Sequence, residues 1–127
     1  MRLALVGANC ALARHVVPLL APHELACTDT EAVDIRQPEA AASAVADAEV
    51  LLHFGTAAVP AWSGVPDAAA ETLDHHTRGT YHLLQAASAA GVARVVVCST
   101  VEVMLGHSPQ WRVNENYRPR PLAEPLP

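Results

Sequence analysis

The hydrophobic pattern of this chain alternates between short apolar runs and longer stretches with helical periodicity. Within each run, apolar residues occupy consecutive positions, as in the strands of a parallel sheet that is covered on both faces. We therefore predict strands at residues 2–6, 24–28, 49–54 and 94–99. The brief extended piece Val33-Asp34-Ile35 is a candidate for a further strand, the third in chain order.

The stretches between the runs are rich in alanine or carry apolar residues at three- and four-residue steps, which favours helix. They predict helices at residues 11–20, 38–48 and 67–90. Pro18 should kink or end the first helix, whereas Pro38 suits the first turn of the second. In the third helix, which Gly91 ends, the predicted buried face is formed by Leu73, Thr77, Thr80, Leu84 and Ala87.

This alternation predicts an α/β fold: a three-layer α/β/α, doubly wound parallel sheet of Rossmann type. Right-handed crossovers give the strand order 3-2-1-4-5, with the switch point between the first and fourth strands. Ligands of such sheets bind beyond the carboxyl ends of the strands at that point. Prolines recur after Gly106, so we predict a domain at 1–106 and a Pro-rich extended tail at 107–127.

Composition narrows the class of protein. The 127 residues are 51% hydrophobic but only 4% aromatic, which predicts one domain with a core of Ala, Val and Leu. A formal charge of -5, with the basic residues all Arg and scattered, gives no basic surface for nucleic acid. No apolar run is long enough to span a membrane.

Three isolated cysteines, Cys10, Cys27 and Cys98, have no metal-binding spacing. Each lies in or beside an apolar run, which predicts buried thiols in a cytoplasmic protein.

The first residues also resemble a signal peptide, but Gly7 and Asn9 interrupt their apolar run. His75 and His82 lie seven residues apart, yet no carboxylate or cysteine completes a metal site, so packing or solvated roles are favoured.

The first strand is followed at once by Gly7 and then by a helix, an arrangement that suits a pyrophosphate at the helix N-terminus. The dinucleotide fingerprint places three glycines here, and this chain has Gly7, Cys10 and Ala13. Cys10 brings a side chain to the position of closest approach and lacks the freedom of glycine at positive φ. A packed substitution and a redox-sensitive thiol are both compatible with it.

Further stretches follow in a fixed order: Asp29; Asp34-Ile35; His53-Phe54-Gly55-Thr56; Arg78-Gly79-Thr80 with Leu83-Leu84; and Ser99-Thr100-Val101-Glu102-Val103. With the glycine turn, they resemble the N-terminal part of the extended short-chain dehydrogenase family, the NAD-dependent epimerases and dehydratases. The resemblance implies NAD as the cofactor. It also implies that Asp29 accepts hydrogen bonds from the ribose hydroxyls and so disfavours NADP, although Asp29 could also simply cap a strand end.

The residues that the resemblance implies at the cofactor are Gly7, Asn9, Cys10, Ala11, Leu12, Asp29, Asp34, Ile35, Phe54, Gly55 and Thr56. It implies that Thr100, or Ser99, holds the oxygen of an alcohol substrate. Counting back from Gly106 instead places Val101 there.

The catalytic Tyr-x-x-x-Lys pair of that family is missing. Tyr81 and Tyr117 are followed four residues later by Gln85 and Pro121, and the chain contains no lysine. We expect this chain to be inactive alone, either as a fragment of a longer enzyme or as a degenerate relative. The alternative is a non-catalytic nucleotide-binding or protein-interaction module, with a homodimer or another partner covering the sheet edge at 94–99.

Overall fold

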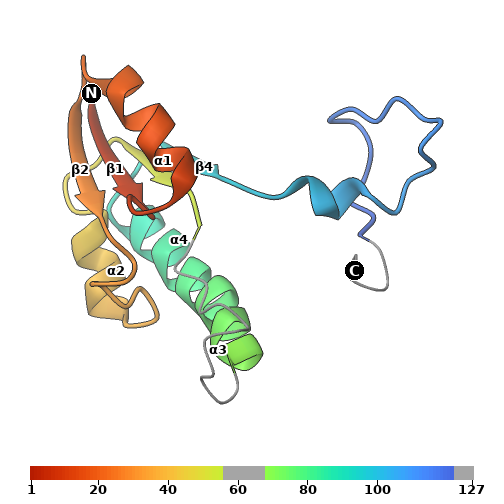
Figure 1. Cartoon of the computed structure of the whole chain (residues 1–127). Coiled ribbons are helices and arrows are strands. Elements are labelled where there is room, and N and C mark those ends of the chain that lie inside the picture. The colour runs from red at the N-terminus through yellow and green to blue at the C-terminus, as the bar shows by residue number, and fades with distance from the viewer. Residues whose placement is uncertain (56–67, 122–127) are drawn as a thin grey trace.

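A parallel sheet is the centre of the computed structural model, which describes residues 1–55 and 68–121 (Figure 1). Its four strands lie in the order β2-β1-β3-β4 among the described residues. They are β1 (Arg2–Val6), β2 (Glu24–Thr28), β3 (Val50–His53) and β4 (Arg94–Val97). The predicted α/β class with a parallel sheet is therefore confirmed.

Helical segments connect the strands. They are α1 (Ala11–Val16), η1 (Val17–Leu20), α2 (Pro38–Ala44), α3 (Ala68–Asp74), η3 (His75–Gly79), α4 (Thr80–Ala89) and η4 (Val101–Met104). The segments η1 and η4 are 3-10 helices and η3 is a π-helical turn. Pro18 lies in the first turn of η1, which explains why α1 ends early, as predicted.

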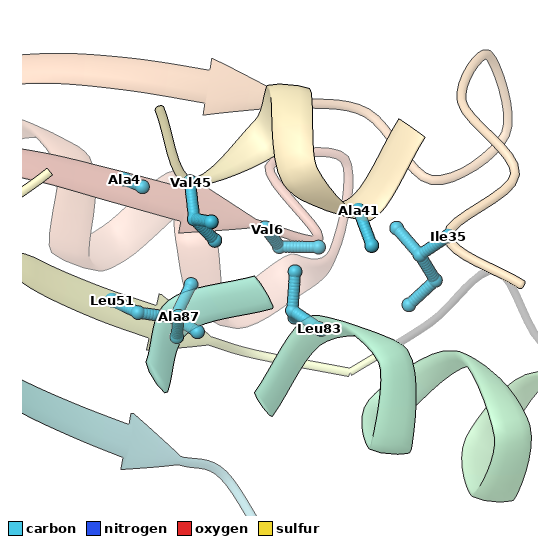
Figure 2. Packing of buried hydrophobic residues seen from close by; sticks show 8 residues of the cluster. All are labelled: Ala4, Val6, Ile35, Ala41, Val45, Leu51, Leu83 and Ala87. Carbon is cyan, nitrogen blue, oxygen red and sulfur yellow. The ribbon is translucent and has the colours of Figure 1, made fainter. Parts of the chain in front are cut away.

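The core lies between the sheet and the pair α2 and α4 (Figure 2). Helix α1 covers the opposite face of the sheet. Ala4 and Val6 of β1 point toward α2 and α4. Because strand residues alternate between the two faces, Leu5 belongs to the opposite face. The buried cluster is formed by Ala4, Val6, Ile35, Ala41, Val45, Leu51, Leu83 and Ala87.

The predicted strand at 33–35 is wrong. The carbonyl of Asp29 accepts the N–H groups of Ala32 and Val33, and these turn hydrogen bonds take the place of a sheet ladder. Ile35 then turns its side chain into the core, where it is fully buried. The predicted order 3-2-1-4-5 consequently loses its first member, and the other four predicted strands lie in the order expected for them.

The predicted buried face of the long helix is also largely wrong. Leu73 and Leu84 are 64% and 40% exposed. The buried positions are Ala68, His75, Gly79, Leu83 and Ala87. From His75 onward these positions recur every fourth residue, because the wider turn of η3 shifts the face away from regular α-helical spacing.

The edge strand β4 is exposed along its whole length, and Val95, Val96 and Val97 are 37%, 43% and 48% exposed. Cys27 and Cys98 lie on exposed positions too, so the prediction of buried thiols is wrong for both. Cys27 belongs to the edge strand β2, and Cys98 directly follows the edge strand β4. Both edge strands are more exposed than the central strands β1 and β3. No helix in the described ranges is long and apolar enough to cross a membrane.

Residues 105–121 contain no helix or strand and extend away from the sheet (Figure 1). The segment is closed at its base, because the N–H of Gly106 donates to the carbonyl of Arg120 over 2.7 Å. The rings of His107, Trp111 and Tyr117 contact one another within it. The boundary of the predicted tail at 107 stays a prediction, and residues 122–127 lie outside the described ranges.

Candidate functional site

Three loops meet where β1, β2 and β3 end. The N–H groups of Gly7 and Ala8, after β1, both donate to the carbonyl of Thr28 at the end of β2, over 3.0 and 3.1 Å. On the other side, a Cβ atom built on Gly7 would lie 2.6 Å from the carbonyl oxygen of Gly55, after β3. The first and third loops therefore approach each other so closely that only glycine fits at position 7.

The backbone angles separate the fingerprint positions. Gly7 has a φ of 91°, in the region that favours glycine, whereas Cys10 has a φ of -74° and a ψ of 159°. The expectation that position 10 needs glycine for its backbone conformation is therefore wrong. Cys10 caps α1 instead: its Sγ accepts the N–H of Ala13 over 3.4 Å.

The remaining predicted residues of this turn surround that cap. The Oδ1 atom of Asn9 accepts a hydrogen bond from Thr30 Oγ1 over 3.5 Å, which ties the turn to the loop after β2. Ala11 and Leu12 are exposed in the first turn of α1, where backbone N–H groups have no partner within the helix. Asp29 is exposed as well, and its Oδ1 accepts the N–H of Glu31 over 2.8 Å.

A cavity of about 380 Å³ lies between the loop after β2 and α3. Its charged lining consists of Glu31, Asp34, Glu71 and Arg36. The guanidinium of Arg36 binds the carboxylate of Asp34 through two hydrogen bonds, from Nε over 2.8 Å and from Nη2 over 3.0 Å. These bonds lower the pKa of Asp34 below its ordinary value, so this carboxylate is ionised at neutral pH.

Ile35 does not line this cavity. The neighbouring Asp34 faces it, while the Ile35 side chain is buried in the core (Figure 2). Sequence reasoning missed Arg36, whose partners Glu71 and Asp74 are 35 and 38 residues away. The sequence contained one local signal of this contact, the two-residue spacing of Asp34 and Arg36. Residues two apart in a loop can form the paired guanidinium–carboxylate contact seen here.

A second cavity, of about 530 Å³, lies beyond the ends of β3 and β4. It brings together the predicted residues Phe54, Gly55, Ser99 and Thr100. His53, His76, Thr80, Val97 and Cys98 complete its lining. Thr56, the last predicted cofactor residue, lies outside the described ranges.

His53 and His75 are buried beside these two cavities, at 2% and 8% exposure. The ring Nε2 of His53 lies 3.0 Å from Thr80 Oγ1. In the described part of the chain, neither nitrogen of His75 has a hydrogen-bond partner. Burial is the main cause that lowers the pKa of both histidines, so both rings are neutral at pH 7. No group of three or more potential ligands among the described residues is placed to hold a metal ion.

The fold of this chain is similar to the folds of several solved structures. A short-chain dehydrogenase/reductase superfamily protein from Agrobacterium tumefaciens with bound NAD is 25% identical, with a TM-score of 0.78 over 97% of this chain and 40% of that one. UDP-glucose 4-epimerase of Thermus thermophilus in complex with NAD is 25% identical, with a TM-score of 0.76 over 95% of this chain and 45% of that one. Uronate dehydrogenase from Agrobacterium tumefaciens, at 24% identity and a TM-score of 0.70, shares the fold over 94% of this chain and 48% of that one.

This chain thus spans less than half the length of each of those three proteins. A search of curated proteins finds no match. The family model described as NAD dependent epimerase/dehydratase family matches residues 4–124, which is nearly the whole chain. The resemblance carried by the ordered sequence stretches is therefore confirmed, and the chain belongs to the NAD-dependent epimerase/dehydratase family.

Proposed function

We propose that this chain binds NAD across the carboxyl ends of β1, β2 and β3. The observation that carries the proposal is the contact among the three loops, above all the approach of Gly7 to the carbonyl of Gly55. Because Gly7 has no side chain, the loops after β1 and β3 pack against each other at the ends of their strands. The exposed first turn of α1, which follows Gly7, offers N–H groups to a pyrophosphate. The NAD-bound solved structures of similar fold support the same ligand class.

We propose NAD rather than NADP because the charge around the first cavity opposes a 2′-phosphate. Carboxylates of Glu31, Asp34 and Glu71 line that cavity. The guanidinium of Arg36, which could otherwise bind a phosphate, already binds three carboxylates. Asp29 stands exposed at the end of β2, where a carboxylate accepts hydrogen bonds from ribose hydroxyls.

The second cavity is proposed as the nicotinamide and substrate end. Bound NAD would supply hydride acceptance there. Thr100, or Ser99, would hold the oxygen of a sugar or steroid-like alcohol by a hydrogen bond, since both residues line this cavity beside Phe54 and Gly55. The chain has no lysine to lower the pKa of a proton-transferring tyrosine. We therefore propose that this chain alone binds the cofactor without turning over substrate. We also propose that it does so in the reducing environment of the cytoplasm.

Calorimetric titration with NAD, NADH and NADP tests this proposal. We expect NAD and NADH to bind and NADP to bind at least about tenfold more weakly. Asp29→Ala should weaken NAD binding and reduce the preference over NADP, while Glu39→Ala, an exposed carboxylate on α2, should change neither. Absence of binding by NAD and NADH at millimolar concentration would refute the proposal.

The second candidate function is a protein-interaction module, and the exposure of β4 favours it. An edge strand with three exposed valines is a template for pairing with another strand. We propose a second copy of this chain as the partner. Light scattering should then give a dimer that Val96→Lys converts to a monomer, whereas a monomeric parent chain at working concentration would exclude this candidate.

A further inference from the structure

Residues 106–120 form a closed loop that extends away from the sheet (Figure 1). The N–H of Gly106 donates to the carbonyl of Arg120 over 2.7 Å, and the N–H of Arg120 donates to the carbonyl of Val103 over 2.6 Å. A Cβ atom on Gly106 would meet the carbonyl oxygens of Arg120 and Pro121, so glycine is required where the two ends of the loop meet. Compact surface loops of this size with neighbouring ends are frequently functional.

The loop holds an aromatic cluster that stays partly open to solvent. The ring centroid of His107 lies 5.4 Å from that of Tyr117 and 6.1 Å from that of Trp111. The Nε2 atom of His107 lies 3.0 Å from the carbonyl oxygen of Arg118, which fixes the imidazole against the loop backbone. Trp111 nevertheless remains 55% exposed and Tyr117 38% exposed. The loop therefore presents two aromatic side chains of the kind that is enriched at protein interfaces.

Charge distinguishes this loop from the rest of the chain. Residues 106–120 contain three arginines and one acidic residue, which gives a formal charge of +2. Residues 1–105 contain five arginines and eleven acidic residues, which gives a formal charge of -6. Opposite charges attract and orient two approaching surfaces. The charge distribution therefore favours contact between the loop of one copy and the domain of another.

A groove of about 450 Å³ lies at the end of the sheet opposite to the cofactor side. Met1, His23 and Ala93, which directly precede β1, β2 and β4, line it, so the groove opens at the amino ends of the strands. Its two charged side chains, Glu49 and Arg94, have opposite signs, and most of the remaining lining is apolar. The strand residues in the lining are Leu3, Val50, Leu52, Arg94 and Val96.

This groove belongs to the sheet face that is turned away from α2 and α4. The core residues Ala4 and Leu51 point toward those helices, and the strand residues of the groove occupy the alternate positions. Leu20 of η1 borders the groove on this face, and Val96 of the edge strand β4 lines it at 43% exposure. The groove therefore reaches the open edge of the sheet.

The path of the chain brings the loop near this groove in a second copy. The chain leaves β4 at the carboxyl end of the strand and continues into the loop, whereas the groove opens at the amino ends (Figure 1). In an antiparallel pair of β4 strands, the carboxyl end of each strand lies beside the amino end of the other. Each loop then leaves its own sheet next to the groove of the other copy.

Resting on the dimer that forms the second candidate function above, we propose that two copies exchange their 106–120 loops. The β4 strands pair in antiparallel orientation, and Trp111 of each copy fills the groove of the other beside Leu20 and Val96. The aliphatic lining buries the indole ring, and Arg94 offers its guanidinium to the face of that ring. Each copy gives one loop and receives one, so the interface closes at two copies.

The test measures the dissociation constant of the dimer by sedimentation equilibrium. Trp111→Ala removes two contacts of the dimer at once, so it should raise this constant at least about a hundredfold, about tenfold for each contact. Leu20→Lys should have a similar effect, because it places a charge in the apolar groove. Should Leu20→Lys not fold by circular dichroism, Leu20→Gln takes its place.

Tyr81→Ala is the matched control. Tyr81 lies on α4 and is 56% exposed, almost the same fraction as Trp111, but it belongs to neither the loop nor the groove. This variant should change the dissociation constant by less than about twofold.

Mixing the two variants distinguishes exchange between copies from docking within one copy. The Trp111→Ala dimer keeps both grooves but lacks both indoles, and the Leu20→Lys dimer keeps both indoles but lacks both grooves. Their heterodimer contains one indole that matches one intact groove. With one variant fluorescently labelled, the heterodimer should therefore form at least about tenfold more tightly than either variant homodimer.

Each contrary result has a separate meaning. A monomeric parent chain overturns the β4 dimer and this inference with it. A parent dimer that folded Trp111→Ala leaves unchanged overturns the inference alone, since the β4 edges then pair without the loops. Equal weakening by Tyr81→Ala also overturns it, because the interface would then include α4. A mixture no tighter than its homodimers overturns it as well, because each loop would then contact its own copy.

Discussion

Replacing Gly7 with alanine tests the contact on which the candidate site depends. Two separate effects should destabilise this variant. The first is conformational, because the backbone φ of Gly7 is 91°, where residues with a side chain are strained. The second is steric, because the new Cβ would lie 2.6 Å from the carbonyl oxygen of Gly55, a backbone atom that cannot rotate away.

The two effects can be sized separately. A residue held at such a φ costs about 1–3 kcal/mol. Relieving an overlap with backbone requires the ends of β1 and β3 to move apart, which costs about 1–3 kcal/mol more. The sum, about 2–6 kcal/mol, is a large part of the roughly 5–15 kcal/mol that holds a domain folded.

Gly91→Ala is the matched control. Gly91 also has a positive φ, of 72°, but a Cβ there would meet no atom within 4 Å. It should show the conformational effect alone, so the difference between the two variants measures the overlap. The measurement is urea unfolding followed by circular dichroism. If Gly7→Ala loses no more stability than Gly91→Ala, the two loops do not touch and the geometry of the candidate site is wrong.

Three further predictions concern the core and its histidines. Leu51→Ala, in the fully buried centre of β3, should lower the free energy of unfolding by about 2–5 kcal/mol, whereas Leu73→Ala should change it by less than about 0.5 kcal/mol, both by urea unfolding. Thr80→Val should lower it by about 1–3 kcal/mol, because His53 loses its 3.0 Å partner with little change of shape. Burial lowers the pKa of His53 and His75 below the ordinary 6.5, so the unfolded chain binds more protons than the folded one. The free energy of unfolding, measured by urea unfolding at each pH, should therefore be highest above about pH 6.5 and fall as the pH drops toward 5. This decrease should be less steep in His75→Phe.

Most of the sheet could be predicted from the sequence because its strong signal has a simple physical origin. Central strands covered on both faces need apolar residues at consecutive positions, and β1 and β3 have them. A weaker signal, the two β-branched residues Val33 and Ile35 on either side of Asp34, was misleading. A β-branched pair beside aspartates also suits a turn in which the carbonyl and carboxylate of the aspartates accept backbone N–H groups, and Ile35 reaches the core from that turn.

The prediction of the buried face of the long helix failed for a reason that the periodicity of the sequence could not show. The predicted face assumed regular α-helical geometry from the start of the helix to Ala87. The π-helical turn at His75–Gly79 changes the spacing, and it brings Gly79 rather than Thr77 against Ile35. A contact between a helix and a distant loop decided the register, and the local pattern contains no record of that contact.

The two aspartates of the candidate site show the same limit most clearly. In the sequence, Asp29 and Asp34 are equivalent, since each stands in the segment after β2 and each is followed two residues later by a charged residue. In the structure, Asp29 keeps an exposed carboxylate that accepts the N–H of Glu31, its neighbour in the same turn. Asp34 is held by a guanidinium whose other bonds reach α3. The Asp29 carboxylate is therefore held only within its own turn, whereas the orientation of the Asp34 carboxylate depends on a pairing between Arg36 and Glu71 across 35 residues.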